Sequence, residues 1–544
     1  MQTMRSMIQY RYKVTAILFA MVCSALLAGD LAAQEARNKN FDLEYVRRQN
    51  GWLGSLNGSR LQYAPVNVSF AEGYFDKQGG DFKESWESPN SYLFGLKTES
   101  FRQFGKIGFY GKMQYEYFGG KDMSGSMLIQ PGEYPYDLLE FTPGRKIRER
   151  YILSGGIGTE LWGALSGGLM INYETDNYSK RVDLRHKNTR MDFEIMPGLS
   201  YTFEGITIGA NFITGKKTET IEVETIGWNN NYDAFYNRGL WFGPYTHYEG
   251  SGLHFSETGL TGFPIINFTN GAALQFGLNN ERGLSTFHEF AYRHIAGENG
   301  EKDYIWYFDK TNRFNYKGSA TISGADITHL IRAEASYSDL KGYENIITRE
   351  VISGVTQPVI YGHSLTLQQR KFSAALEYEM HWDTEAYNPL QSARLGVEYA
   401  NRSLIGSLMY PYYYTQYVDT YRIYAGFDRN LYFDDSNILK LGATLGYYTG
   451  SGDKLTKGKT SAPAGLITGD YPHLKQDYMD YEWEYLTAGR VDFSLHARYT
   501  TLVGKGSIPL YFDLKYTRYN AVKEPEFLKS NNRNLFTIKV GCLF

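Results

Sequence analysis

The last ten residues of the chain, Leu535 to Phe544 (LFTIKVGCLF), carry an apolar side chain at every even-numbered position. Successive side chains of a β-strand point to opposite faces, so residues two apart share a face. The even-numbered face of such a strand consists of Phe536, Ile538, Val540, Cys542 and Phe544. Lys539 belongs to the opposite face. The stretch therefore predicts a strand with one apolar and one polar side.

The same alternation recurs along the chain. Apolar residues occupy every second position from Val491 to Tyr499 and from Ile508 to Tyr516, and charged residues such as Lys515 lie between them. A wall with hydrocarbon on one face and water on the other needs this pattern over about ten residues per strand. A secreted β-sandwich can share it in single strands, but its repetition favours an all-β, antiparallel transmembrane β-barrel.

Eighteen segments fit this pattern, and a count of roughly 16 to 20 strands is compatible with the sequence. They are residues 66–76, 91–101, 106–118, 148–161, 164–178, 190–203, 206–217, 262–278, 284–296, 313–322, 327–338, 366–382, 391–410, 420–433, 438–449, 485–500, 507–519 and 533–544. If both ends of the barrel lie in the periplasm, the eight short links fall on one rim and nine mostly longer links on the other. Short periplasmic turns and long extracellular loops are typical of outer-membrane barrels.

The composition excludes a bundle of membrane helices. Aromatic residues make up 16 %, hydrophobic residues 42 % and charged residues 21 %, with a mean hydropathy of −0.43. Beyond the first thirty-odd residues no apolar run reaches the roughly 18 to 20 residues that a spanning helix needs. Aromatic residues near strand ends, such as Tyr447 and Tyr448, are candidates for a girdle at the lipid headgroups.

The N-terminus predicts export. Basic residues precede the apolar stretch from Val14 to Gly29, and small residues follow at Ala32 and Ala33, so residues 1–33 are interpreted as a cleaved signal peptide. Residues 34–544 carry a net charge of −5, which gives no indication of nucleic acid as a partner. Only Cys542 remains of the two cysteines, so neither an intramolecular disulfide nor a metal site built on cysteine pairs is expected.

A chain that ends on an aromatic residue directly after an apolar-faced strand, behind a signal peptide, resembles Gram-negative outer-membrane β-barrels. Across nearly all of residues 34–544 the chain looks most like uncharacterised outer-membrane barrel proteins of the Bacteroidota. The resemblance implies a location in the cell outer membrane among lipid and lipopolysaccharide. It also implies that the assembly machinery reads the terminal strand, with Phe536, Ile538, Val540 and Phe544 as its signal. Partner proteins stay unknown.

Residues 34–65 precede a barrel domain of residues 66–544 and are expected in the periplasm or the lumen. This segment has only 32 residues, far fewer than the plug of TonB-dependent receptors, so a full plug is excluded. A short stretch from Trp52 to Leu61 is the candidate to enter the lumen. Its place before the first strand loosely resembles the hatch of long-chain fatty-acid channels, although the Asn-Pro-Ala signature of that family is missing.

The longest predicted outer loop, residues 218–261, is rich in aromatic residues. Rings with neighbouring amides can stack on sugars, but they can equally pack the loop on itself or narrow the mouth of the barrel. The candidate ligand or constriction residues are Trp228, Tyr232, Tyr236, Trp241 and Tyr245.

Two further outer loops are charged. The carboxylates of loop 450–484, including Asp480 and Glu482, are interpreted as a solvated acidic surface rather than a cation site. Loop 179–190 is basic, and Arg181, Arg185 and Lys187 are candidate contacts for outer-leaflet lipid phosphates, with a plain solvated hairpin as the alternative.

The sequence contains no recognisable catalytic motif. His288 and His294 are six residues apart on a predicted strand, about 20 Å, so they cannot share one zinc ion. The Gly-Lys-Thr at residues 458–460 lacks the glycine of a phosphate-binding loop, and no Gly-x-Ser-x-Gly motif occurs. No catalytic residue, metal ligand or cofactor is predicted.

Three functions remain. The leading hypothesis is a non-enzymatic passive channel or substrate-specific porin for small solutes, because an 18-stranded barrel with a polar inner face leaves a lumen. The second is a surface-binding or structural barrel with a closed lumen that works in a partner complex. The third is a barrel hydrolase whose site assembles from residues on several strands.

Overall fold

The computed structural model describes residues 42–65, 67–224, 233–238, 245–249, 262–280, 283–301, 304–385, 388–409, 412–434, 437–457, 472–503 and 508–544. The predicted signal peptide lies outside these residues.

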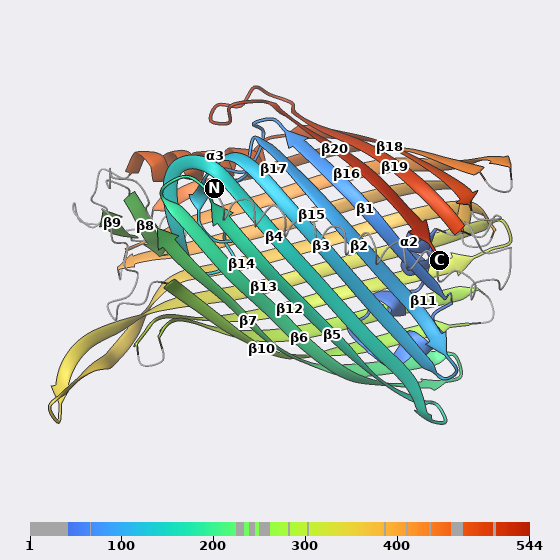
Figure 1. The fold of residues 1–544 in the computed structure, drawn as a ribbon, viewed down its shortest axis with the longest axis horizontal. Coiled ribbons are helices and arrows are strands. Elements are labelled where there is room, and N and C mark those ends of the chain that lie inside the picture. The colour runs from blue at the N-terminus through green and yellow to red at the C-terminus, as the bar shows by residue number, and fades with distance from the viewer. Residues whose placement is uncertain are drawn as a thin grey trace, which may run out of the picture.

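The chain forms a closed antiparallel barrel of 18 strands (Figure 1). The strands are β1 (Val68–Gly79), β2 (Asn90–Phe104), β3 (Ile107–Ser126), β4 (Tyr136–Trp162), β5 (Leu165–Lys180), β6 (Arg185–Phe203), β7 (Ile206–Glu224), β10 (Gly262–Asn279), β11 (Leu284–Glu301), β12 (Tyr304–Ser323), β13 (Ile327–Ile352), β14 (Val355–Glu385), β15 (Asn388–Met409), β16 (Tyr412–Asp434), β17 (Asn437–Lys457), β18 (Arg490–Val503), β19 (Ile508–Ala521) and β20 (Asn532–Leu543). Each pairs with its neighbour, and β1 pairs with β20 to close the wall. Two more strands, β8 (Asp233–Arg238) and β9 (Tyr245–Glu249), form a hairpin, and β8 pairs with the first residues of β4.

The predicted strand count and the distribution of turns are confirmed. Links such as Gly105–Lys106 and Glu204–Gly205 join strands at one end, here called the short-turn rim, and the longer links lie at the other, the long-loop rim. Glu204 and Gly205 both have positive φ angles, of 46° and 80°. This backbone suits the tight hairpin turns that match the twist of a sheet.

Several strands run further toward the long-loop rim than the sequence pattern predicted. β4 begins at Tyr136 rather than at residue 148, and β13 and β14 continue into a ribbon that projects from the wall (Figure 1). Backbone hydrogen bonds hold these extensions together. Such pairing does not require alternating apolar residues, so the sequence pattern did not reveal the extensions. The prediction was also wrong at the start of β18, because the helix α3 (Pro472–Thr487) occupies residues up to 487.

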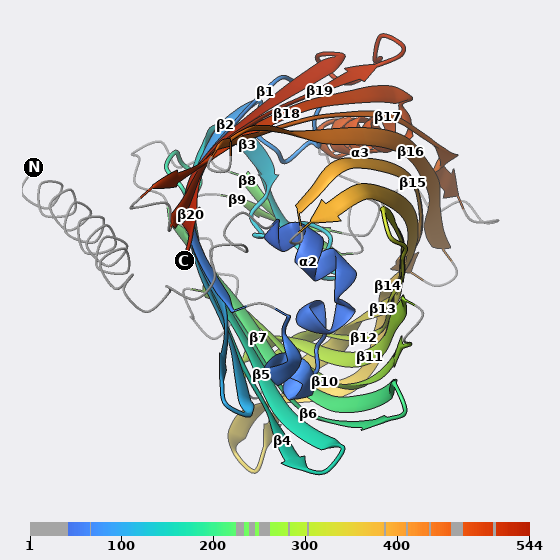
Figure 2. The ribbon, with the colours of Figure 1, turned by 90° about the vertical axis from the view of Figure 1, so that its right-hand side faces the viewer.

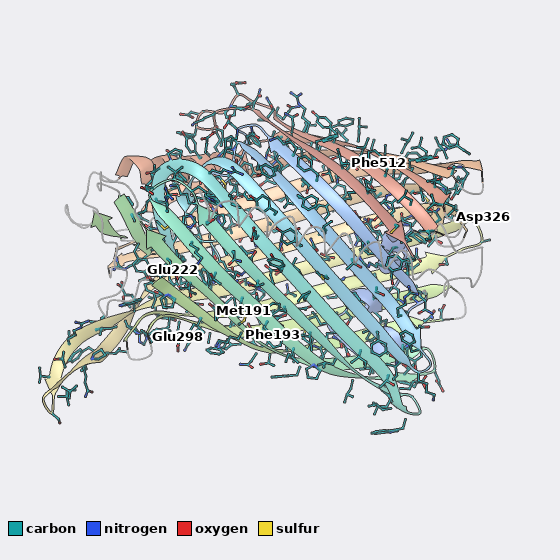
Figure 3. The ribbon with its side chains drawn as sticks, in the orientation of Figure 1. Met191, Phe193, Glu222, Glu298, Asp326 and Phe512 are labelled. Carbon is teal, nitrogen blue, oxygen red and sulfur yellow. The ribbon has the colours of Figure 1, made fainter. Side chains whose placement is uncertain are left out.

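The predicted facing of the last strand is confirmed. Val540 and Phe536 are 47 % and 39 % exposed on the outside, whereas Lys539 lines the lumen. On the neighbouring strand Phe512 also points away from the barrel (Figure 3). Among the girdle candidates, Tyr447 faces outward as predicted, but Tyr448 was wrongly placed. It faces inward, where its hydroxyl donates to the Leu486 carbonyl at 2.8 Å, because adjacent strand residues face opposite ways.

No helix in the described part of the chain is long and apolar enough to cross a membrane. Within the same residues, no group of three or more His, Cys, Asp or Glu side chains could hold a metal ion.

Candidate functional site: a chamber between a plug and a cap

Residues 42–63 lie inside the barrel and are called the plug segment (Figure 2). The segment consists of the helix α2 (Leu43–Gln49) and two 3-10 turns, η2 (Gly51–Gly54) and η3 (Gly58–Tyr63). Each begins at a side chain that accepts backbone N–H groups, namely Asp42, Asn50 and Asn57. Such caps allow helices this short to form at defined positions.

Charged groups of α2 bind three separate parts of the wall. Lys440 on β17 donates to Asp42 at 2.7 Å, Arg48 donates to Glu379 on β14 at 2.8 Å, and Arg47 pairs with Glu99 on β2. Burial opposes the ionised form of Asp42, but Lys440 and Arg498 outweigh it and hold the pKa of this carboxyl below its usual value. The ion pairs therefore fix α2 at points far apart around the barrel.

Hydrogen bonds to carboxylate, carbonyl and amide groups of the wall hold the rest of the plug segment. Glu289 on β11 accepts from the Ser55 hydroxyl at 2.7 Å and from the Leu56 N–H at 2.9 Å. Asn57 donates to the Leu199 carbonyl on β6 at 3.0 Å, and to Gln275 on β10 at the same distance. The bonds from Ser55 to Glu289 and from Asn57 to Gln275 are buried, so their loss would leave polar groups unsatisfied.

Glycines on the inner wall let the plug backbone touch the strands directly. A Cβ atom at Gly158 on β4 would stand 2.3 Å from the Gly58 carbonyl oxygen, and one at Gly168 on β5 would stand 2.3 Å from the Gly58 carbonyl carbon. Gly108 on β3 is similarly close to the backbone of residues 61 and 62. The seat of the plug segment is thus built into the sequence of three neighbouring strands.

The opposite end of the lumen is covered by a cap. The link between β3 and β4, residues 127–135, folds inward, and its apolar residues join a buried cluster with strand residues and β8. The members are Met127, Leu128, Tyr134, Tyr136, Leu138, Leu184, Ile221, Ala234, Tyr236, Phe263, Ile265 and Tyr307. The Ile129 N–H donates to Glu219 on β7 at 3.1 Å, which holds the link against the wall.

The helix α3 extends this cap, with Met479 in a second apolar cluster. The interpretation of loop 450–484 as a solvated acidic surface was wrong for two of its carboxylates. Glu482 and Asp480 are buried, and they pair with Arg402 on β15 at 2.8 Å and with Lys454 on β17 at 2.5 Å. Helical geometry turns them toward the barrel, and that could not be inferred for a predicted loop.

A chamber lies between the cap and the plug segment. One cavity of about 910 Å³ is bounded by Glu133 and Tyr134 of the cap, and a second of about 590 Å³ by Gly54 and Leu56 of the plug. The two share wall residues, including Arg293. Their volumes suit small solutes.

The aromatic loop contributes partly to the cap. Tyr236 on β8 is buried among Tyr136, Phe263 and Tyr307, with ring centroids 5.4 to 6.1 Å from its own. Tyr245 lies on β9, opposite Asn237. Trp228, Tyr232 and Trp241 lie outside the described residues. Among the candidates whose side chains the structure describes, Tyr236 belongs to the buried cluster of the cap.

The basic loop divides between two environments. Arg181 and Lys187 are exposed, and Arg185 pairs with Asp183 at 2.7 Å, so these three residues remain candidates for phosphate contacts. Lys180 and Arg190, also counted in this basic loop, are buried instead. They pair with Glu140 and with Asp176, because the strands β5 and β6 extend to residues 180 and 185.

A cluster near α2 superficially resembles a hydrolase site. Ser392 lies 2.9 Å from Nδ1 of His381, and Glu379 lies 3.2 Å from Nε2. A nucleophile, a base and an orienting acid need such contacts. However, Glu379 is also bound by Arg48 and Arg332, and Tyr45 packs its ring against His381 at 4.8 Å. The cluster therefore serves as a seat for the plug segment.

The fold and the chamber define the class of protein as a large β-barrel of the outer-membrane type with an internal plug segment. The chain belongs to a family described as "Family of unknown function (DUF6850)", whose model matches residues 59–544. No protein of curated function matched the sequence.

The chain is similar to several solved structures at low identity and with low TM-scores. The ferric preacinetobactin receptor BauA from Acinetobacter baumannii is 10 % identical, with 88 % of this chain and 80 % of that chain covered and a TM-score of 0.36. The ferric-catecholate import receptor Fiu from E. coli K12 is 10 % identical, with 88 % of this chain and 82 % of that chain covered and a TM-score of 0.37. OccAB3 from Acinetobacter baumannii is 10 % identical, with 88 % of this chain and 99 % of that chain covered and a TM-score of 0.29. At these identities the likeness concerns the fold alone.

Proposed function

We propose that this protein is a substrate-specific channel that passes a small polar solute across the outer membrane of a Gram-negative bacterium. The observation that carries the proposal is the polar chamber between the cap and the plug segment. An unobstructed porin would have no need of a built seat for residues 42–63. A chamber with two boundaries instead suits a solute that is bound before it passes.

The proposed orientation places the long-loop rim outside the cell and the short-turn rim in the periplasm, as is usual for such barrels. The resemblance of the sequence to barrels of the Bacteroidota supports this location. Lipid and lipopolysaccharide would then surround the wall, with Arg181, Arg185 and Lys187 within reach of lipid phosphates. We propose no catalytic step, because the groups of the Ser392 cluster are committed to holding α2.

Conductance across a planar lipid bilayer tests the function. The purified full chain is expected to show small or intermittent currents, and a variant lacking residues 34–62 is expected to show larger, steady currents. Heat-modifiable migration confirms that both barrels are folded. Silence of the folded variant would overturn the channel and leave the closed structural barrel as the function.

The terminal strand gives a prediction about assembly. Deletion of Phe544, or its change to alanine, is expected to lower the amount of folded protein in the outer membrane severalfold. Recognition of the strand by the assembly machinery is a kinetic step, so the refolded barrel should keep nearly its normal stability. Thr537→Ser, on the inward face of the same strand, is the control. Equal amounts of folded Phe544→Ala and wild-type protein in isolated membranes would contradict the assembly signal.

A further inference from the structure

A row of basic side chains crosses five neighbouring strands on the chamber wall, and we propose that its centre binds the anionic group of the transported solute. The strand register pairs each member with the next. The row consists of Arg293 on β11, Arg313 on β12, Ser338 on β13, Lys371 on β14 and Arg402 on β15. All five line the larger cavity. Because adjacent strands are about 4.8 Å apart, the row forms a continuous band.

The two ends of this basic row are neutralised by carboxylates. Glu194 on β6 accepts from Arg293 at 3.2 Å, and Glu482 on α3 accepts from Arg402 at 2.8 Å. The centre differs. Within the described part of the chain neither Arg313 nor Lys371 has an ion-pair partner, and Lys371 donates only to the Gly132 carbonyl of the cap, at 3.3 Å. In the described residues, two cations on either side of a serine hydroxyl thus face the cavity without a carboxylate in ion-pair contact.

A second row on the same wall offers acceptors instead of donors. Asn267 on β10 and Asp309 on β12 flank Gly297 in register, and both are buried and line the larger cavity. In each the Oδ1 atom has no hydrogen-bond partner. A Cβ at Gly297 would stand 2.2 Å from Oδ1 of Asp309, so the glycine allows the two side chains to lean together. Unsatisfied buried acceptors in a cavity wall are a site for donors of a ligand.

The two rows together specify the ligand chemistry. Arginine and lysine can only donate, so the basic row selects a carboxylate, sulfate or phosphate. Asp309 and Arg313 lie four residues apart on one face of β12, about 13 Å along the strand. The fitting solute is therefore a small organic anion that carries hydroxyl or ammonium donors at its far end, such as a sugar acid. This inference deepens the proposed function, since the site lies on the proposed route.

Isothermal titration of the full chain in detergent tests the site, with inorganic sulfate and D-glucuronate as probes and D-glucose as the neutral comparison. Wild type is expected to bind both anions more tightly than glucose. The double variant Arg313→Gln/Lys371→Gln should weaken sulfate binding at least tenfold. Arg370→Gln is the matched control, because Arg370 adjoins Lys371 but is 54 % exposed on the other face, and it should bind as wild type does.

The acceptor row is tested separately. Asp309→Ala is expected to leave sulfate affinity within about twofold of wild type and to weaken glucuronate severalfold. Equal sulfate affinity in wild type and the double variant, with both barrels heat-modifiable, would overturn the anion site. A barrel that binds sulfate but stays silent after deletion of residues 34–62 would overturn the channel and keep the anion site. Steady current without sulfate binding would overturn the anion site and keep the channel.

Discussion

Changing Gly158 to valine is expected to displace the plug segment from the barrel and to raise ion conductance to the level of the variant that lacks it. A Cβ at this position would stand 2.3 Å from the Gly58 carbonyl oxygen and 2.8 Å from Oε1 of Gln62. A sideways shift of the plug backbone toward β5 is blocked because Gly168 already lies against Gly58, so relief of the contact requires the plug to move away from the wall. Overpacking of this kind costs about 1 to 3 kcal/mol, comparable to several net hydrogen bonds of the segment.

Two measurements check this result. Steady current in a planar bilayer reports an open lumen, and tryptic cleavage at Arg47 or Arg48 reports a displaced plug segment. Gly155→Val is the control, since Gly155 lies on the same strand but a Cβ there would meet nothing within 4 Å. It should remain protease-resistant and conduct as wild type does. Equal behaviour of Gly158→Val and Gly155→Val would show that the seat is not rigid.

The second large effect concerns the outer face of the last strand. Val540 is 47 % exposed on the outer face of the barrel, and in the proposed membrane location an arginine there is expected to lower the free energy of unfolding by about 2 to 4 kcal/mol. Lys539→Gln changes the opposite face of the same strand, where the side chain lines the lumen, and should cost little.

The free energy of unfolding of both variants, measured in lipid vesicles, tests which face of β20 is directed to lipid and which to the lumen. Because the strand stays the same and only the face changes, backbone propensity largely cancels. Similar losses for Val540→Arg and Lys539→Gln would mean that β20 does not separate lipid from water as described.

Much of the wall could be predicted from the sequence, because a strand with lipid on one face and water on the other alternates apolar and polar residues. The outward residues are apolar from Leu510 to Tyr516 in β19 and from Phe536 to Cys542 in β20, so a period of two reveals both strand and face. This alternation ends where the strand extends beyond the membrane. The inward turns of Glu482 and Lys180 follow from a helix and from extended hairpins, and neither has a characteristic spacing.

The chamber could not be predicted because it depends on register. Alternation gives the face of a residue but not its neighbour across the sheet. Arg313 and Lys371 are 58 positions apart, and only the pairing of both with Ser338 brings them into one row. Likewise nothing in the sequence near Glu289 indicates that it accepts hydrogen bonds from Ser55.

The plug segment also constrains the order of assembly. Its contacts reach Glu99 on β2, Glu289 on β11, Glu379 on β14 and Lys440 on β17, which together surround the lumen. The pairing of β1 with β20 closes the wall around these four positions, so we expect the plug segment to reach all of its contacts only in the closed barrel. The segment that precedes the strands in the sequence is therefore expected to be seated after they have closed, and protease resistance of residues 42–63 would mark a barrel whose closure is complete.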